Sequence, residues 1–370
     1  MDCCSTHQKK IIIVAEGSQT NKSTATNLNK LISELNAVAQ VTYVFSYCNP
    51  SDLVGAINLK SISDSSQGGI RKFISNQIQL PIKLFSKSVR NNCDIILFAF
   101  GEDLQLSSMI LYAILGKTVL IRSDGRPSKA IMYYKPKSRL LKYLFKAIET
   151  ISYGVCDRIL TECDYMIKVN QFPPQSGVLK LYTDTQLFNN RFPTLQRKYD
   201  IGYIGRFEPE KGILLLLDAL LLLPPTFNIL IIGDGSQKKE VMEKVEHLTQ
   251  REYSIHFEDW VRNDCLPDYL NGLKMLVMPS NKEGLPNTLL EAMSCGVVPI
   301  ATSVGGIPNI ITHHNGHLLS NNSPKTLACA IDYALSNQQL LSTMSINASN
   351  YVEENYSFSV VVDEIKTLTH

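Results

Sequence analysis

The sequence predicts an α/β protein in which two parallel sheets are each covered by helices on both faces. One observation is that short runs of Val, Ile and Leu alternate with amphipathic helical stretches along the whole chain. Strands buried on both faces are expected to read as such near-continuous apolar runs. The other observation is that the runs form two series, separated by a Pro- and Asn-containing segment at 189–193. Two series predict two doubly wound domains.

Five strands are predicted in each series. In the first half they are Ile11–Ala15, Val41–Phe45, Ile95–Phe100, Thr118–Arg122 and Arg158–Thr161. In the second half they are Asp200–Gly205, Asn228–Gly233, Ser254–Phe257, Met275–Pro279 and Val298–Thr302. Ligands of such sheets bind at the carboxyl ends of the strands, so the loops that follow these runs are expected to carry the chemistry.

Length and composition fit a folded protein of two domains. The chain has 370 residues, of which 44% are hydrophobic and 19% charged. This balance argues against a disordered chain. The most apolar stretch, Gly212–Pro225, contains Asp218 and is shorter than the roughly 18 residues of a membrane span, which favours a buried helix.

The N-terminus lacks the features of a signal peptide. Nine cysteines, an odd number with no CxxC pair, favour a reduced cytoplasmic setting without structural zinc.

Charge is distributed unevenly between the two halves. Residues 1–195 carry 23 Lys and Arg against 14 Asp and Glu, whereas residues 196–370 carry 13 against 20. A basic half attracts an anionic acceptor, an anionic membrane surface or nucleic acid, and charge alone does not choose among them. The segment Tyr133–Ile148 combines five Lys and Arg with Leu, Tyr and Phe. This pattern suits a helix lying on anionic lipid, and it equally suits an ordinary surface helix with a solvated basic face.

The first motif with chemical content is the segment 205–212, which reads Gly-Arg-Phe-Glu-Pro-Glu-Lys-Gly. It follows a predicted strand and precedes a predicted helix, so Arg206 and Lys211 share one loop at the carboxyl end of a strand. A planar guanidinium and a compact ammonium together suit a diphosphate. If that diphosphate leaves during a reaction, the two cations stabilise the developing charge and no metal is required. A surface loop with an Arg–Glu pair is the alternative interpretation.

The second motif is the segment 283–291, in which two carboxylates stand at Glu283 and Glu291. Pro286 suits the first turn of a helix, where its missing N–H costs little. The backbone amides of Asn287 and Thr288 would then face outward at a helix N-terminus, which attracts phosphate. A pair of Glu at a helix start is more commonly an effect of the helix dipole.

Taken in order, these motifs resemble the retaining glycosyltransferases of family 4. The resemblance rests on Gly-Arg-x-x-x-Glu-Lys-Gly, on Gly233-Asp234-Gly235 after a strand, and on the Glu-x7-Glu block that continues into Ala292–Gly296. It extends to the segment 304–311, to Asn315-Gly316 and to Tyr356-Ser357-Phe358. The similarity is dense over residues 200–358. It implies the two-domain GT-B fold, with residues 1–190 on the acceptor side of a central cleft, residues 191–352 binding the donor, and a helix at 353–370 that crosses back to the first domain.

The resemblance also implies roles for the matching positions. Arg206 and Lys211 would hold the donor diphosphate, Glu291 the ribose, and Glu283 the transferred sugar. The remaining donor-binding positions implied are Gly205, Gly233, Gly235, Val261, Gly284, Leu285, Asn287 and Thr288. Sugar transfer from a nucleoside-diphosphate donor, UDP-linked rather than GDP-linked, would proceed with retention and without a metal or other cofactor.

The first half matches the family more weakly. Many members carry a His after the strand that corresponds to Thr118–Arg122, whereas this chain reads Arg122-Ser123-Asp124-Gly125. Asp124, or else Arg122, would replace that group, and Asp124 is the expected catalytic residue. The acceptor is expected to be a glycan or a lipid-linked saccharide. The protein would then be cytoplasmic, with a peripheral membrane contact through Tyr133–Ile148 and no nucleic-acid partner.

Two other functions remain open from the sequence. One is a nucleotide-sugar isomerase or phosphorylase on the same fold, because a fold does not fix a reaction. The other is a non-catalytic nucleotide-sugar binder, suggested by the missing His. A dinucleotide-binding enzyme is disfavoured because Lys238 occupies the third glycine position after Gly233 and Gly235. The adjacent His313 and His314 have no acidic or Cys neighbours in sequence and are expected to be a surface loop.

Overall fold

The computed structural model describes residues 8–15, 22–46, 53, 59–61, 70–100, 105–123, 125–128 and 139–369. The chain divides into two compact units. Unit 1 contains residues 1–181 together with 361–370, and unit 2 contains residues 182–360. The segment 189–193 therefore lies inside unit 2. None of the helices in the described part of the chain combines the length and the hydrophobicity that a membrane span requires.

Unit 1 is built on a seven-stranded parallel sheet with the strand order β3-β2-β1-β4-β5-β6-β7. The strands are β1 (Lys10–Ala15), β2 (Gln40–Ser46), β3 (Leu59–Ser61), β4 (Ile95–Ala99), β5 (Thr118–Arg122), β6 (Arg158–Thr161) and β7 (Gly177–Val178). Every residue of β4 is buried, as is every residue of β1 after Lys10. Such burial requires helices on both faces, and this explains the unbroken apolar runs of the sequence.

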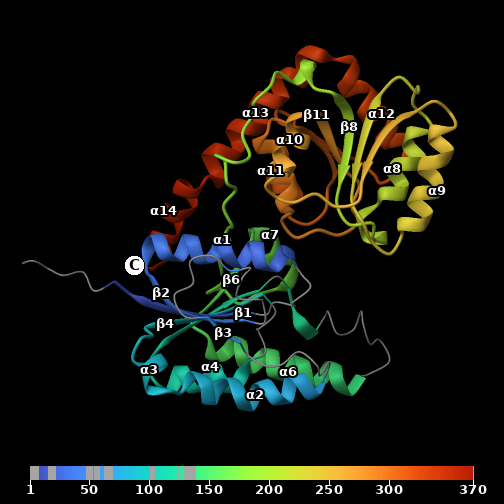
Figure 1. Cartoon of the computed structure of the whole chain (residues 1–370). Coiled ribbons are helices and arrows are strands. Elements are labelled where there is room, and N and C mark those ends of the chain that lie inside the picture. The colour runs from blue at the N-terminus through green and yellow to red at the C-terminus, as the bar shows by residue number, and fades with distance from the viewer. Residues whose placement is uncertain are drawn as a thin grey trace, which may run out of the picture. The chain divides into compact units, whose positions relative to one another are not determined.

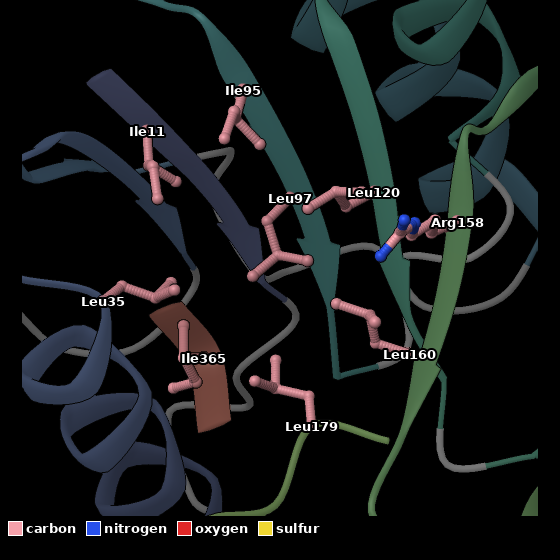
Figure 2. Close-up of a pocket in the computed structure, with 9 residues that line it drawn as sticks. All are labelled: Ile11, Leu35, Ile95, Leu97, Leu120, Arg158, Leu160, Leu179 and Ile365. Carbon is pink, nitrogen blue, oxygen red and sulfur yellow. The ribbon is translucent and has the colours of Figure 1, made fainter. Parts of the chain in front are cut away.

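Two layers of helices supply that cover (Figure 1). On one face lie α2 (Ile70–Leu84), α3 (Lys87–Arg90), α4 (Leu106–Ile114) and α6 (Arg139–Val155), and α1 (Lys22–Val38) and α7 (Asp164–Asn170) lie on the other. The C-terminal helix α14 (Phe358–Thr369) adds Ile365 to the α1 side. Figure 2 shows this side chain with Leu35 of α1 around a small apolar cavity of about 50 Å³. The last turns of the chain thus contribute to the core of the first unit.

Unit 2 is built on a six-stranded parallel sheet with the strand order β10-β9-β8-β11-β12-β13. The strands are β8 (Tyr199–Ile204), β9 (Asn228–Ile232), β10 (Ser254–Glu258), β11 (Leu273–Met278), β12 (Val298–Thr302) and β13 (His317–Leu319). The helices are α8 (Ile213–Leu220), α9 (Lys238–Thr249), α10 (Leu266–Asn271), α11 (Asn287–Ser294), α12 (Pro324–Ser336) and α13 (Gln338–Tyr356). The most apolar stretch of the sequence is indeed a buried helix, α8.

The core of unit 2 follows from the period of a strand. Successive side chains of β9 point to opposite faces, so Ile229 and Ile231 join one core cluster while Leu230 and Ile232 join the other. The chain runs from the central strand β8 outward through β9 and β10. It then returns to pair β11 with the other side of β8 and runs outward through β12 and β13. The order therefore reverses between β8 and β11, and the crevice for a ligand is expected there.

All ten predicted strands are present, with bounds that differ by at most two residues at either end. The strands β3, β7 and β13 were not predicted. They are two or three residues long and each pairs with a single neighbour at a sheet edge. A strand of this length shows no apolar run that a sequence pattern can reveal.

Arg197 holds three parts of unit 2 together. Its guanidinium donates to the carbonyl of Leu273 at 2.8 Å, to that of Cys295 at 2.7 Å and to the side chain of Asn190 at 2.8 Å. The side chain is 5% exposed, and this burial lowers the pKa of Arg197 to about 10. The guanidinium thus joins β11, the end of α11 and the first segment of the unit.

We predict that Arg197→Met destabilises unit 2 by about 3 kcal/mol or more, because buried acceptors left without a donor cost about 1–3 kcal/mol each. Urea unfolding followed by fluorescence of Trp260, the single tryptophan of the chain, reports on unit 2. Arg262→Met is the matched control, because the Arg262 side chain is 68% exposed and its guanidinium contacts Asp264 and Cys265 of its own loop. Equal midpoints for the two variants would show that Arg197 does not hold the unit together.

Candidate active site

Two loops meet at the reversal point of the unit 2 sheet. The loop 205–212 follows β8 and the loop 279–286 follows β11, and these two strands are neighbours. The amide of Asn281 donates to the carbonyl of Glu210 at 2.7 Å. Gly212 has a φ of +72°, and a Cβ added there would lie 2.2 Å from the carbonyl oxygen of Pro279. The close approach of the two loops therefore requires glycine at this position.

The centre of the site is an ion pair between these loops. The Nζ of Lys211 lies 2.8 Å from both carboxylate oxygens of Glu283. The Glu283 side chain is 5% exposed and that of Lys211 is 21% exposed. A carboxylate this far from water needs a counter-charge, and Lys211 supplies it. The structure thus brings together two residues that the sequence analysis treated as separate donor contacts.

Tyr203 supports this pair, and sequence analysis did not single it out. It is 3% exposed, and its hydroxyl donates to the backbone carbonyl of Arg206 at 2.9 Å. Burial and, secondarily, the negative charge of Glu283 raise the pKa of the Tyr203 hydroxyl well above its usual range. In the sequence Tyr203 is one apolar residue of a strand, so only the fold reveals that it fixes the loop after that strand.

Arg206 differs from Lys211 in its surroundings. Its side chain is 68% exposed, and its nearest ion-pair partner, Glu210, lies 3.8 Å away. An exposed pair at this distance contributes little to stability. The guanidinium is therefore accessible to an anion, whereas Lys211 is held in place beside Glu283.

The predicted glycines line the contact between the loops after β8 and β9. A Cβ on Gly233 would lie 2.0 Å from the carbonyl oxygen of Gly205, and one on Gly235 would lie 2.6 Å from that of Phe207. The amide of Phe207 donates to the carbonyl of Asp234 at 2.8 Å. Packing alone thus requires glycine at positions 233 and 235, in addition to any approach of a ligand.

Glu208 fastens the same two loops from outside. Ser236 donates to its carboxylate from the hydroxyl at 2.6 Å and from the backbone amide at 3.1 Å. These hydrogen bonds lower the pKa of Glu208. Glu208, one of the two acidic residues of the first motif, is therefore part of the loop scaffold.

The Glu-x7-Glu block begins at the loop after β11 and continues into α11. Pro286 precedes the helix instead of occupying its first turn, and Asn287 and Thr288 are the first two helical residues. Their N–H groups lie where an α-helix makes no bonds of its own. Glu291 is 5% exposed and lies one turn further along. Leu285 is 9% exposed in the core, so only its backbone is available to a ligand.

The glycine pair at 305–306 holds the backbone of this block. Gly305 has a φ of +61°, and a Cβ there would lie 2.2 Å from the carbonyl oxygen of Glu283. The amide of Gly306 donates to the carbonyl of Gly284 at 2.8 Å. This stretch was part of the resemblance but had no role assigned to it. It follows β12, which lies on the other side of β11 from β8, so the Glu283 loop is held between the β12 loop and the Lys211 loop.

A polar cavity of about 170 Å³ lies at the carboxyl ends of β11, β12 and β13. It is lined mainly by hydroxyl and amide side chains, which are those of Ser280, Asn281, Thr302, Ser303, Ser320, Asn321 and Asn322. It adjoins the loop that carries Glu283, and sequence analysis did not predict it.

The remaining predicted residues are Val261, Asp124 and Arg122. Val261 is half-buried after β10, next to the exposed Trp260. Asp124 lies outside the described residues. Arg122, the alternative to it, is fully buried at the end of β5. Its Nη2 lies 3.1 Å from Glu162, and its guanidinium stacks over Phe100 at 4.8 Å.

The two histidines at 313–314 contact each other with ring centroids 3.7 Å apart and ring planes tilted by 43°. In the part of the chain that the structure describes, no three His, Cys, Asp or Glu residues gather as a metal site would require. The pair was expected to be a surface loop, and both residues are exposed.

A double-mutant cycle tests the ion pair. We predict that Lys211→Met and Glu283→Gln show a coupling free energy of about 1–3 kcal/mol, because each single change leaves a nearly buried charge without its partner. The exposed pair Arg206–Glu210 is the control, with a coupling below about 1 kcal/mol. Additive effects of Lys211→Met and Glu283→Gln on the unfolding midpoint would contradict the pairing.

Comparison with known proteins agrees with this architecture. Residues 185–351, which lie within unit 2, match the family described as Glycosyl transferases group 1. An uncharacterized glycosyltransferase of Methanocaldococcus jannaschii is 31% identical over 157 residues, or 41% of this chain and 43% of that protein. A capsular polysaccharide biosynthesis glycosyltransferase of Staphylococcus aureus is 25% identical over 199 residues, or 50% of each chain. The chain thus aligns with about half the length of these relatives.

The similarity in structure extends over the whole chain. A crystal structure of Anabaena Alr3699/HepE in complex with UDP superposes with a TM-score of 0.76 at 15% identity, and covers 98% of this chain and 99% of that one. At this identity the superposition shows the fold. The chain has the GT-B fold, and its second unit carries the sequence signature of the group 1 glycosyl transferases.

Proposed function

We propose that the chain is a glycosyltransferase that moves a sugar from a nucleoside-diphosphate donor to a hydroxyl acceptor with retention of configuration. The observation that carries this proposal is the Lys211–Glu283 pair, which joins the loops after β8 and β11 at the reversal point of the sheet. The exposed guanidinium of Arg206 lies on the same loop as Lys211. A positively charged loop at this point suits the phosphates of a nucleotide.

Each residue of the site has a role in this proposal. Arg206 and Lys211 hold the diphosphate and stabilise the charge that develops on it as it leaves, so that catalysis needs no divalent metal. Glu283 accepts from a hydroxyl of the transferred sugar, and Glu291 from the ribose. Backbone groups of the loops after β8, β9 and β11, of Val261 and of the start of α11 complete the donor site. They belong to Gly205, Gly233, Gly235, Gly284, Leu285, Asn287 and Thr288.

The proposed donor is UDP-linked. The UDP complex of the HepE structure, whose fold this chain shares, supports that choice over a GDP-linked donor. The hydroxyl and amide groups around the cavity beside the Glu283 loop suit a sugar, which presents hydroxyls that both donate and accept.

The proposed acceptor is a glycan, a lipid-linked saccharide or a polysaccharide precursor. The Staphylococcus aureus relative named for capsular polysaccharide biosynthesis supports this class. The excess of basic residues in the first half favours an anionic acceptor, or one that is presented at an anionic membrane through the segment Tyr133–Ile148. Asp124 is proposed as the acceptor-side catalytic group.

Thermal unfolding with a panel of nucleotides tests the donor site. A ligand that binds only the folded chain raises the melting temperature. We expect UDP and UDP-sugars to raise it, with the same shift in the presence of EDTA. Stabilisation by GDP and its sugars alone would replace the proposed donor, and a shift that EDTA abolishes would contradict the metal-free mechanism. Binding without acceptor-dependent release of UDP would indicate a binder or an isomerase instead.

We predict that Lys211→Ala lowers turnover by about 10²–10³-fold, the range for losing one group that stabilises developing charge. The measurement is the initial rate of UDP release with donor and acceptor, at a temperature where the folded fraction of the variant has been verified. Lys244→Ala is the control, because Lys244 pairs with Asp218 on the helical layer away from the loops. Wild-type turnover in Lys211→Ala would remove this residue from the mechanism.

A further inference from the structure

The outer helices of unit 1 expose an unusual number of large apolar side chains. Each of α2, α4 and α6 carries a pair spaced four residues apart, so both members lie on the same side of the helix. These pairs are Ile78 and Ile82, Ile110 and Ile114, and Leu140 and Leu144, and we call the six residues the outer apolar face. Their exposure ranges from 38% for Ile110 to 81% for Leu140.

The three helices form one layer. α4 packs against α2 on one side and against α6 on the other, and Figure 1 shows all three on the same face of the sheet. Met109 and Tyr112 of α4 are fully buried toward the core, so Ile110 and Ile114 point outward. The outer apolar face is therefore one surface that spans three neighbouring helices. Monomeric soluble proteins rarely leave a large apolar surface of this kind in contact with water.

The charges on these helices are almost all positive. The segments α2, α3, α4 and α6 contain eight Lys and Arg and a single acidic residue, Glu149. Glu149 is fully buried and accepts from Arg126 at 2.7 Å and from the amide of Ser128 at 3.0 Å. The central helix α4 has no charged residue at all. The described surface of the layer thus combines apolar side chains with cations and no exposed carboxylate.

We propose that the outer apolar face of α2, α4 and α6 docks the chain onto the surface of an anionic lipid bilayer. An apolar stripe bordered by lysines is the pattern of helices that lie in the membrane interface. Lys142 and Lys146 lie on α6, and Lys83 and Lys87 lie at the end of α2 and on α3, where they meet the negative potential of the lipid headgroups. Tyr143, which is 66% exposed, has the ring and hydroxyl that suit the headgroup region.

The charge distribution favours lipid over a second copy of the chain. A two-fold dimer through this face would place the same patch against itself. The lysines of both copies would then lie together with no carboxylate to offset them, whereas an anionic bilayer compensates them. The docking face extends well beyond the basic segment Tyr133–Ile148, because two of its three apolar pairs lie on α2 and α4. It also does not depend on the donor chemistry of unit 2.

Vesicle flotation of the full chain tests the proposal. We expect binding to phosphatidylcholine vesicles that contain about 30% phosphatidylglycerol, and weaker binding as salt screens the charges. Ile82→Glu combined with Ile114→Glu is expected to lower partitioning at least about tenfold, because two exposed apolar side chains that would enter the lipid are replaced by charges that the headgroups repel. Lys142→Gln combined with Lys146→Gln should lower it by about fivefold for each lysine.

The matched control is Ile346→Glu, which places the same charge on α13 of unit 2 at a residue that is 57% exposed. We expect this variant to float like the wild type. All the substituted side chains are at least partly exposed, so melting temperatures and the response to UDP should not change. That response separates a failure of the docking proposal from a failure of the proposed donor site.

Two results would overturn the proposal. One is a failure of the flotation test, which means either wild-type partitioning of the Ile82→Glu, Ile114→Glu variant or no binding of the wild type to the vesicles that contain phosphatidylglycerol. The other is a concentration-dependent dimer in analytical ultracentrifugation that Ile114→Glu dissociates, because a second copy would then occupy the face.

Discussion

The candidate site depends on one interaction, the ion pair of Lys211 with Glu283. It joins residues 72 positions apart in sequence, and it exists because the central strand β8 has β11 as its neighbour. The loops that leave these two strands emerge side by side at the point where the strand order reverses. A doubly wound sheet thus converts two distant motifs into one site.

The surroundings of the pair explain several features of the sequence. Gly212 and Gly305 both have positive φ, and each allows a loop to touch a backbone carbonyl where a side chain would collide. The hydroxyl of Tyr203 holds the backbone carbonyl of Arg206 through a hydrogen bond. Since Glu283 is nearly buried, removal of Lys211 leaves the carboxylate charge without compensation. The loops around Glu283 are held by these backbone contacts, so they do not easily rearrange to bring it to water. A diphosphate that approaches the site therefore meets a lysine whose position is already set, and little ordering is left for the ligand to induce.

The fold was predictable from the sequence because strands buried on both faces leave continuous apolar runs, and every such run is a strand in the structure. The short edge strands β3, β7 and β13 leave no such signal. For the site, Lys211 and Glu283 were identified by resemblance, yet their contact was not, since spacing along a chain does not reveal which loops meet. Tyr203 was missed for the same reason, whereas Gly305 was part of the matched segment 304–311 but was given no role. The order of the strands, together with the rule for ligand crevices, would have pointed to the meeting of the two loops.

The two proposals assign different roles to the two units. Unit 2 carries the proposed nucleotide site, and unit 1 carries the proposed lipid-facing helical layer. The pattern of apolar residues in the sequence could not reveal the outer apolar face. On α4, apolar residues occur both on the side that faces the core and on the side that faces outward. Only the burial of Met109 and Tyr112 distinguishes the two sides of that helix.

Calorimetric titration with UDP and with uridine tests the central claim most directly, which is that the loops after β8 and β11 form a site for a diphosphate. The two ligands share a base and a ribose, so the ratio of their affinities isolates the contribution of the phosphates. The account predicts that UDP binds much more tightly than uridine to the wild type, and that Lys211→Met reduces this ratio by about tenfold or more, since hydrogen bonds between charged groups contribute roughly 1.5–3 kcal/mol each. An unchanged ratio in Lys211→Met would mean that the phosphates bind elsewhere, and the account of the site would be wrong.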